Sequence, residues 1–177
     1  MKKEVLTKVS IIIAICIATV ALVLGFVTVN KLSKVKEPKN TTKFNIEFEE
    51  KTLKATTTGG TTIDKDNTRI SGDSITSIIG LKNPGDGVIY TWDIVNNGNV
   101  SAVLENDPTL LGLNNNDKQA VDMEVTINDE RAKKGTEIRA GETATAKIVI
   151  TYKQNAPTVI NPTTVQVIST TLTFKQK

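Results

Sequence analysis

The 177-residue sequence contains no histidine and only one cysteine, Cys16. Without histidine the protein has no Ser-His-Asp or Cys-His catalytic group, no His-ligated zinc and no imidazole that titrates near neutral pH. Cys16 lies inside an apolar N-terminal run, so it provides neither a disulfide within a folded domain nor a thiol nucleophile. These absences exclude the commonest hydrolytic mechanisms, and we expect a protein that is not an enzyme.

Positive charge is scarce outside the N-terminal region. Residues 1–43 contain 8 Lys or Arg and 2 Asp or Glu, a balance of +6, whereas residues 44–177 contain 14 and 17, a balance of −3. The two balances add up to the +3 of the whole chain. A mildly acidic body rich in Thr and Asn lacks the basic surface that binds nucleic acid, so we expect no nucleic-acid partner.

The N-terminal region contains one long apolar run. Residues 1–8 form a basic tail, and residues 9–29, VSIIIAICIATVALVLGFVTV, contain no charge. At about 1.5 Å per residue this run is long enough to cross the hydrocarbon core of a bilayer. It is either a retained signal anchor, which leaves the domain outside the cell membrane, or a signal peptide cut near Gly25, which makes the protein secreted. Residues 30–43 then form a polar, basic linker.

From Phe44 onward hydrophobic residues recur at every second position, as expected for strands with one buried face. The clearest alternation involves Phe44, Ile46 and Phe48; Val121, Met123, Val125 and Ile127; Ala144, Ala146, Ile148, Ile150 and Tyr152; and Ile168, Thr170, Leu172 and Phe174, taken as the last strand. Less regular strands are expected at 61–70, 75–81 and 100–105. We expect one short helical turn in residues 107–117, through Leu110, Leu111 and Leu113.

Turn-forming clusters separate these segments, among them 64–67, 83–87, 96–99, 114–117 and 140–142. Strands of this length between such turns predict an all-β domain at residues 44–177. The expected fold is a two-sheet antiparallel sandwich of seven to nine strands, with jelly-roll or immunoglobulin-like connectivity.

The segment NPGDGVIYTWDIVNNGN, residues 83–99, contains the only tryptophan. Val88, Tyr90, Trp92 and Ile94 share one face of its strand, whereas Thr91 and Asp93 share the other. Because large aromatic side chains are usually buried, we predict that the first face belongs to the core and is not a ligand platform.

Two clusters offer oxygen atoms that could hold a cation, residues 64–67 (DKDN) and 114–117 (NNND). Neither has the spacing of a calcium loop, and Asx side chains in turns bond local backbone amides without a metal. Glu47 and Glu49 alternate onto a solvated face, and no cleft brings paired carboxylates together. We therefore assign no catalytic, cofactor-binding or metal-binding residue and expect no small-molecule substrate.

Three stretches resemble the TasA/camelysin-type family of exported bacterial β-sandwich proteins. They are KNPGDGVIYTWDIVNNGNVSAVL, IRAGETATAKIVITYK and STTLTFKQ, placed after an N-terminal hydrophobic segment. The resemblance implies a jelly-roll or immunoglobulin-like sandwich, export through a dedicated signal peptidase, and a role in extracellular fibres or biofilm matrix. Some relatives are called metallopeptidases, but this chain has no H-E-x-x-H motif.

The first functional hypothesis is a membrane-anchored or secreted surface protein that serves as a structural, fibre-type subunit. The segment from Phe44 to Phe48, FNIEF, follows the linker and is a candidate for self-association by strand addition to a second copy. It is otherwise the first strand of its own sandwich. The alternative hypothesis is a cell-surface binding module that recognises a protein or a glycan through its loops.

Overall fold

The strands of the domain form three hydrogen-bonded sheets in the computed structural model, which describes residues 41–177. The first sheet has the order β1 (Ile46–Thr58), β4 (Gly87–Asn96), β10 (Thr143–Tyr152), β7 (Val121–Ile127) and β8 (Glu130–Arg131). The second has the order β2 (Thr62–Ser71), β3 (Ser74–Gly80), β11 (Gln166–Thr171) and β6 (Leu110–Leu111). The third contains β12 (Phe174–Gln176), β5 (Ala102–Leu104) and β9 (Glu137–Ile138).

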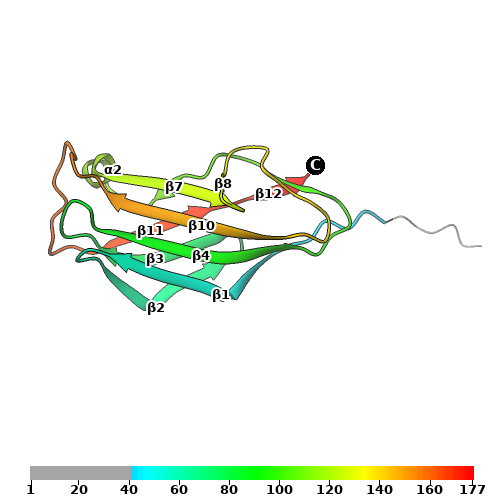
Figure 1. Ribbon diagram of the computed structural model, residues 1–177, viewed down its shortest axis with the longest axis horizontal. Coiled ribbons are helices and arrows are strands. Elements are labelled where there is room, and N and C mark those ends of the chain that lie inside the picture. The colour runs from blue at the N-terminus through cyan, green and yellow to red at the C-terminus, as the bar shows by residue number, and fades with distance from the viewer. Residues whose placement is uncertain (1–40) are drawn as a thin grey trace, which may run out of the picture. The chain divides into compact units, whose positions relative to one another are not determined.

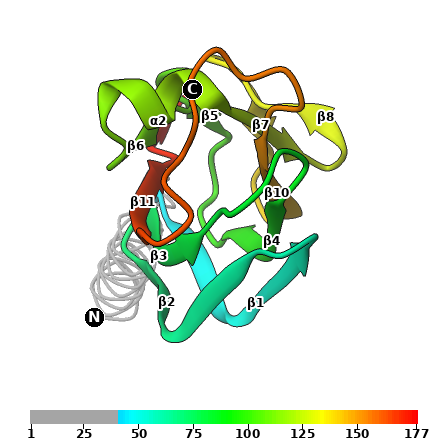
Figure 2. The same ribbon diagram turned by 90° about the vertical axis from the view of Figure 1, so that its left-hand side faces the viewer.

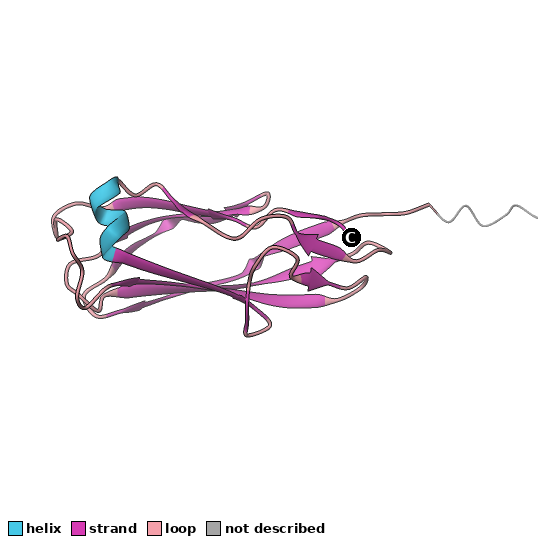
Figure 3. Cartoon of the chain, turned by 90° about the horizontal axis from the view of Figure 1, so that it is seen from above, coloured by secondary structure: helices cyan, strands magenta, loops and turns pink. Residues whose placement is uncertain are grey.

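All of the strand pairings are antiparallel, which confirms the predicted all-β antiparallel domain, but the strands form three hydrogen-bonded sheets and not the two expected. Figure 1 shows β12 following β11 along one line, and Figures 2 and 3 show the first sheet facing the second as packed layers. Twelve strands are present in residues 41–177, more than the seven to nine expected. Seven of them have six or more residues, and five have only two or three. Such short strands carry too little alternation to be recognised in a sequence.

The core lies between the layers and is built around β4. Val88, Tyr90, Trp92 and Ile94 are at most 2% exposed, which confirms that this face belongs to the core. Burial raises the pKa of Tyr90 to about 12, while the neighbouring Ser77 hydroxyl lowers it by a smaller amount. On β10 the predicted alternation is equally regular, with every second residue from Ala144 to Tyr152 buried.

The expected helical turn through Leu110, Leu111 and Leu113 is wrong. Leu110 and Leu111 form β6 and pair with β11, and the helix α2 begins later, at Asn115–Ala120. Asn114 supplies the N-cap, because its side-chain oxygen accepts the N–H groups of Asn116 and Asp117. The helix therefore begins where a polar cap is available and not where the leucines cluster.

The single last strand expected from Ile168 to Phe174 is split into β11 and β12. Its alternation holds, because Ile168, Thr170 and Leu172 are buried and Phe174 packs against the core. The pairing changes at Leu172, whose N–H donates to the carbonyl of Asp73. Two residues later the chain pairs with β5.

β1 and β2, at one side of the sandwich, each carry a bulge in which four residues lie opposite one residue of the neighbouring strand. Between Glu49 and Lys54 the register of β1 shifts against β4, and the Thr52 hydroxyl donates to the Glu49 carbonyl at 2.8 Å. The register of β2 shifts between Asp64 and Arg69, where the expected turn at 64–67 lies, and the Thr68 hydroxyl donates to the Asp64 carbonyl. Bulges of this kind interrupt the row of backbone groups at the edge of a sheet and hinder its pairing with strands of other chains.

Candidate functional site

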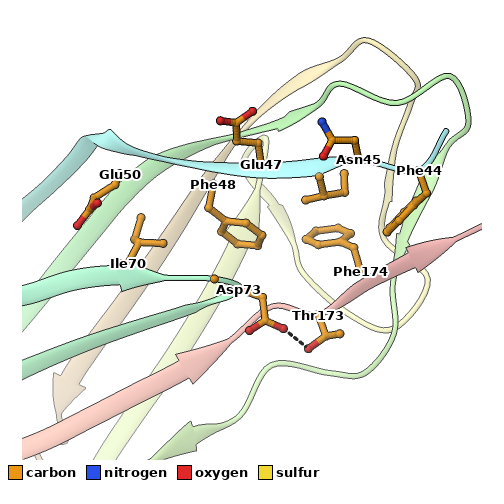
Figure 4. Close-up of a pocket in the computed structure, with 11 residues that line it drawn as sticks. Phe44, Asn45, Glu47, Phe48, Glu50, Ile70, Asp73, Thr173 and Phe174 are labelled. Atoms are coloured by element: carbon orange, nitrogen blue, oxygen red, sulfur yellow. Dashed lines mark hydrogen bonds between the residues drawn. The ribbon is translucent and has the colours of Figure 1, made fainter.

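A groove of about 630 Å³ lies beside the first part of β1. Its walls carry apolar side chains and its rim carries carboxylates, and Figure 4 shows both. The lining residues are Phe44, Asn45, Ile46, Glu47, Phe48, Glu50, Ile70, Gly72, Asp73, Thr173 and Phe174. The rings of Phe48 and Phe174 face each other with their centroids 6.3 Å apart and their planes inclined by 58°.

One wall of this groove is the free edge of β12. β3 begins at Ser74, which pairs with Thr171 of β11. In the β2–β3 turn just before it, the Asp73 carboxylate accepts the Thr173 hydroxyl at 2.7 Å. On the β5 side, the Thr173 carbonyl accepts the N–H of Glu105, and the N–H of Lys177 donates to the Ser101 carbonyl. Since backbone direction alternates along a strand, Phe174 and Gln176 direct their N–H and C=O groups to the other side.

No strand in residues 41–177 pairs with β12 on that second side. The place beside β12 is therefore an open strand position, with the β2–β3 turn at its end and Phe48 above it. An extended peptide in this place would find unpaired backbone groups on β12 and an apolar wall for alternate side chains.

The predicted donor segment, Phe44 to Phe48, forms the other wall of the groove in its own domain. Ile46, Glu47 and Phe48 pair with Asn96, Val95 and Ile94 of β4. Phe44 precedes the strand and is 39% exposed. In the isolated chain the segment is thus the first strand of its own sandwich, at the edge of the first sheet.

The NNGN turn after β4 holds the start of β1. The Lys43 N–H donates to the side-chain oxygen of Asn99 at 2.7 Å, and the Asn99 N–H donates back to the Lys43 carbonyl at 2.9 Å. The side chain of Asn97 donates to Glu47 at 2.8 Å. A Cβ atom at Gly98 would lie 2.4 Å from the Lys43 carbonyl oxygen, so only glycine allows this close approach.

The PGD turn before β4 holds the other end of β1. The buried Asp86 carboxylate accepts the N–H groups of Gly60, Lys82 and Asn83 at 2.7 to 2.9 Å. Burial acts to raise the pKa of Asp86, but the backbone donors outweigh it and hold that pKa below its ordinary value. The two turns that frame Trp92 therefore fasten both ends of β1 to the rest of the domain.

In both oxygen-rich clusters, side-chain oxygen atoms accept hydrogen bonds from residues within the same cluster. Asp64 accepts the N–H groups of Asp66 and Asn67 and the side-chain amide of Asn67, and this last bond lowers the pKa of Asp64 most. In the second cluster Asn114 caps α2. Across residues 41–177 the structure has no group of three or more His, Cys, Asp or Glu side chains arranged to hold a metal ion.

Sequence reasoning did not predict that Asp73, Thr173 and Phe174 border a groove. Phe174 has a signal in the sequence, since it continues the alternation of the preceding strand. The change of pairing at Leu172 has none, because it depends on where β3 begins.

Within residues 41–177 no helix is long and apolar enough to cross a bilayer. The predicted span at residues 9–29, the tail before it and most of the linker lie outside the described residues. Comparison of the chain with protein-family models, with curated proteins and with solved structures found no match.

Proposed function

We propose that this protein is a non-enzymatic structural subunit of the cell surface or the extracellular matrix, which assembles by strand addition between copies. The observation that carries the proposal is the open strand position beside β12, bordered by a strand that lies at a sheet edge. The resemblance to TasA/camelysin-type proteins supports a fibre or biofilm-matrix role. The apolar run at residues 9–29 supports an extracellular location, either anchored or secreted.

The first part of β1 is suited to leave its own sheet. It pairs on one side only, none of its residues is fully buried, and the bulge at residues 50–53 separates it from the second part. Glu49 is the last residue before the bulge to pair with β4, and pairing resumes at Lys54. Thr52 of the bulge donates its hydroxyl to the Glu49 carbonyl and accepts the N–H of Asp93. Release of residues 44–48 therefore leaves Glu49 and the remainder of β1 in place, and the released segment, with Phe44, Ile46 and Phe48 on one face, becomes the donor.

For the finer fold we propose jelly-roll connectivity in preference to an immunoglobulin-like one. In the order β1-β4-β10-β7, no two of these long strands are consecutive in the chain. An immunoglobulin sheet contains sequential neighbours such as its first two strands. Between the long strands of this sheet the chain passes through the other sheets, as in a jelly roll, and the β2–β3 and β7–β8 hairpins are the consecutive neighbours within a sheet in residues 41–177.

A disulfide that fastens the donor segment tests the proposal. Glu47 and Val95 are partners across β1 and β4, so Glu47→Cys with Val95→Cys, in a Cys16→Ser background (the clamped variant), joins them at a distance suited to a disulfide. The oxidised clamped variant is expected to stay unassembled, and reduction is expected to restore filaments. Electron microscopy and sedimentation of the full chain measure both states.

A second cysteine pair gives the matched control. Thr56→Cys with Ile89→Cys joins the same two strands beyond the bulge and leaves the donor segment free, so oxidation is expected to leave assembly unchanged. Assembly of the oxidised clamped variant as efficient as that of its reduced form would contradict strand addition. A chain that stays monomeric at every concentration would favour the binding module instead, and one hollow between its loops is lined by Asn115, Asn116 and Asn161.

A further inference from the structure

The outer face of the first sheet carries a row of cationic side chains next to a row of acidic ones. Lys54 of β1, Lys147 of β10 and Arg131 of β8 lie in one row, separated by Thr91 and Thr126 of the strands between them. The strand alternation places this row away from the core, because Tyr90, Trp92 and Ile148 point inward. Adjacent strands lie about 4.8 Å apart, so the three cations follow one another at about 10 Å.

The acidic row lies one step further along the same strands. It contains Glu49 of β1 and Asp93 of β4, and Thr145 of β10 donates its hydroxyl to Asp93 at 3.0 Å. The structure has two ion pairs within 4 Å in residues 41–177, Lys153 with Asp122 and Lys177 with Glu137. Neither of them uses a charge of these two rows, so the cations and carboxylates of the rows are not paired with each other.

This arrangement is self-complementary under a two-fold axis. An axis parallel to the rows and midway between them turns the cationic row of one copy onto the acidic row of a second copy, with each strand above its counterpart. Lys54 then faces Glu49 of the second copy, and Lys147 faces Thr145 beside Asp93 of the second copy. Because the interface is isologous, each of these contacts occurs twice.

The rows on either side match in the same way. Ile89 and Val95 lie on β4 at equal distances from the axis, one on each side, so Ile89 of one copy faces Val95 of the other. Both are half-buried on the outer face, and Val149 of β10 lies beside Ile89. One apolar contact, Ile89 with Val95, thus lies on each side of the charged centre and adds buried area to electrostatic complementarity, while Val149 faces Thr143 of the other copy.

We propose that the outer face of the sheet β1-β4-β10-β7 is a docking surface for the same face of a second copy, with Lys54 against Glu49 and with Lys147 against Thr145, next to Asp93. This contact goes beyond strand addition, since it uses the flat face of the sheet and neither the donor segment nor the groove. In an assembly built by strand addition it joins neighbouring rows of subunits side by side.

A charge exchange tests the contact in the full chain, purified in detergent. Lys54→Glu and Glu49→Lys each place like charges opposite one another at two symmetric positions, so each is expected to weaken dimerisation about tenfold. The double variant restores opposite charges in reversed order and is expected to dimerise within about threefold of the unmodified chain. Sedimentation across a range of protein concentrations measures the dissociation constant of each.

Lys118→Glu is the matched control, because it makes the same charge change at an exposed residue of α2, outside this face. Dimerisation that is unaffected by either single variant, or a double variant that is not rescued, would overturn the proposal, as would a chain that never dimerises. The outcome is distinct from that of strand addition: oxidation of the clamped variant abolishes filaments, whereas Lys54→Glu weakens only lateral pairing. High salt is expected to weaken the lateral contact and to leave strand addition intact.

Discussion

β1 and β4 are paired neighbours in one sheet, yet they are held in place by different means. β4 has a strand on each side, and its inward residues from Val88 to Ile94 are at most 2% exposed. β1 has one neighbour, carries a bulge of four residues and has no fully buried residue. It is held at its ends, by the Asp86 turn and by the Asn97 to Asn99 turn. β4 is therefore fixed by burial along its length, whereas β1 is docked at the edge of the sheet and held mainly at its ends.

The largest expected change in the free energy of unfolding comes from truncating a core side chain of β4. Trp92→Ala removes a buried indole from β4 and is expected to lower the free energy of unfolding by about 3–5 kcal/mol. Phe48→Ala, on the half-exposed face of β1, is expected to lower it by only about 1 kcal/mol. Chemical denaturation of both variants measures the difference. If Trp92→Ala lowers stability by less than about 1 kcal/mol, or Phe48→Ala by as much as Trp92→Ala, the contrast between the strands is wrong.

The next effect concerns the turn at the far end of β1. Asp86→Asn replaces a charged acceptor of three backbone N–H groups with an amide that has one oxygen and is itself a donor. At least one buried N–H group then lacks a partner, so the free energy of unfolding is expected to fall by about 1–3 kcal/mol at neutral pH. Asp66→Asn, at an exposed position in β2, is the control and is expected to change stability little.

The same carboxylate gives a pH dependence whose sign follows from its pKa. Because the pKa of Asp86 is lower in the folded state than its ordinary value of 3.8, the unfolded chain takes up the proton first as the pH falls. The stabilisation by Asp86 is complete above pH 3.8 and is lost as the pH falls through the folded-state value. Denaturation curves from neutral pH to about pH 2 are expected to show this loss in the unmodified chain and not in Asp86→Asn. Equal acid sensitivity of the two would contradict the role of Asp86.

The sequence predicted β4 well and β1 poorly, for a physical reason. β4 lies between two strands and its alternation coincides with one fully buried face, so the inward positions of Trp92 and its neighbours follow from the period alone. In β1 the residues 50–53 keep the composition of a strand, and only their pairing with β4 shows the bulge. The groove was missed likewise, since it joins β1 to Asp73 and Phe174, which are distant in the sequence.

The smallest effect is local and concerns the start of β1. In Gly98→Ala the new methyl group meets the Lys43 carbonyl oxygen, which must move and weaken its bond with Asn99. We expect about 1 kcal/mol less local stability, which is about fivefold faster amide exchange in residues 46–49 with little change in β4. Gly60→Ala is the control at the other end, where an added Cβ atom meets nothing closer than 3.5 Å. Faster exchange in β4 as well would mean that β1 unfolds only together with the core, and exchange of the donor segment would then require the whole domain to open.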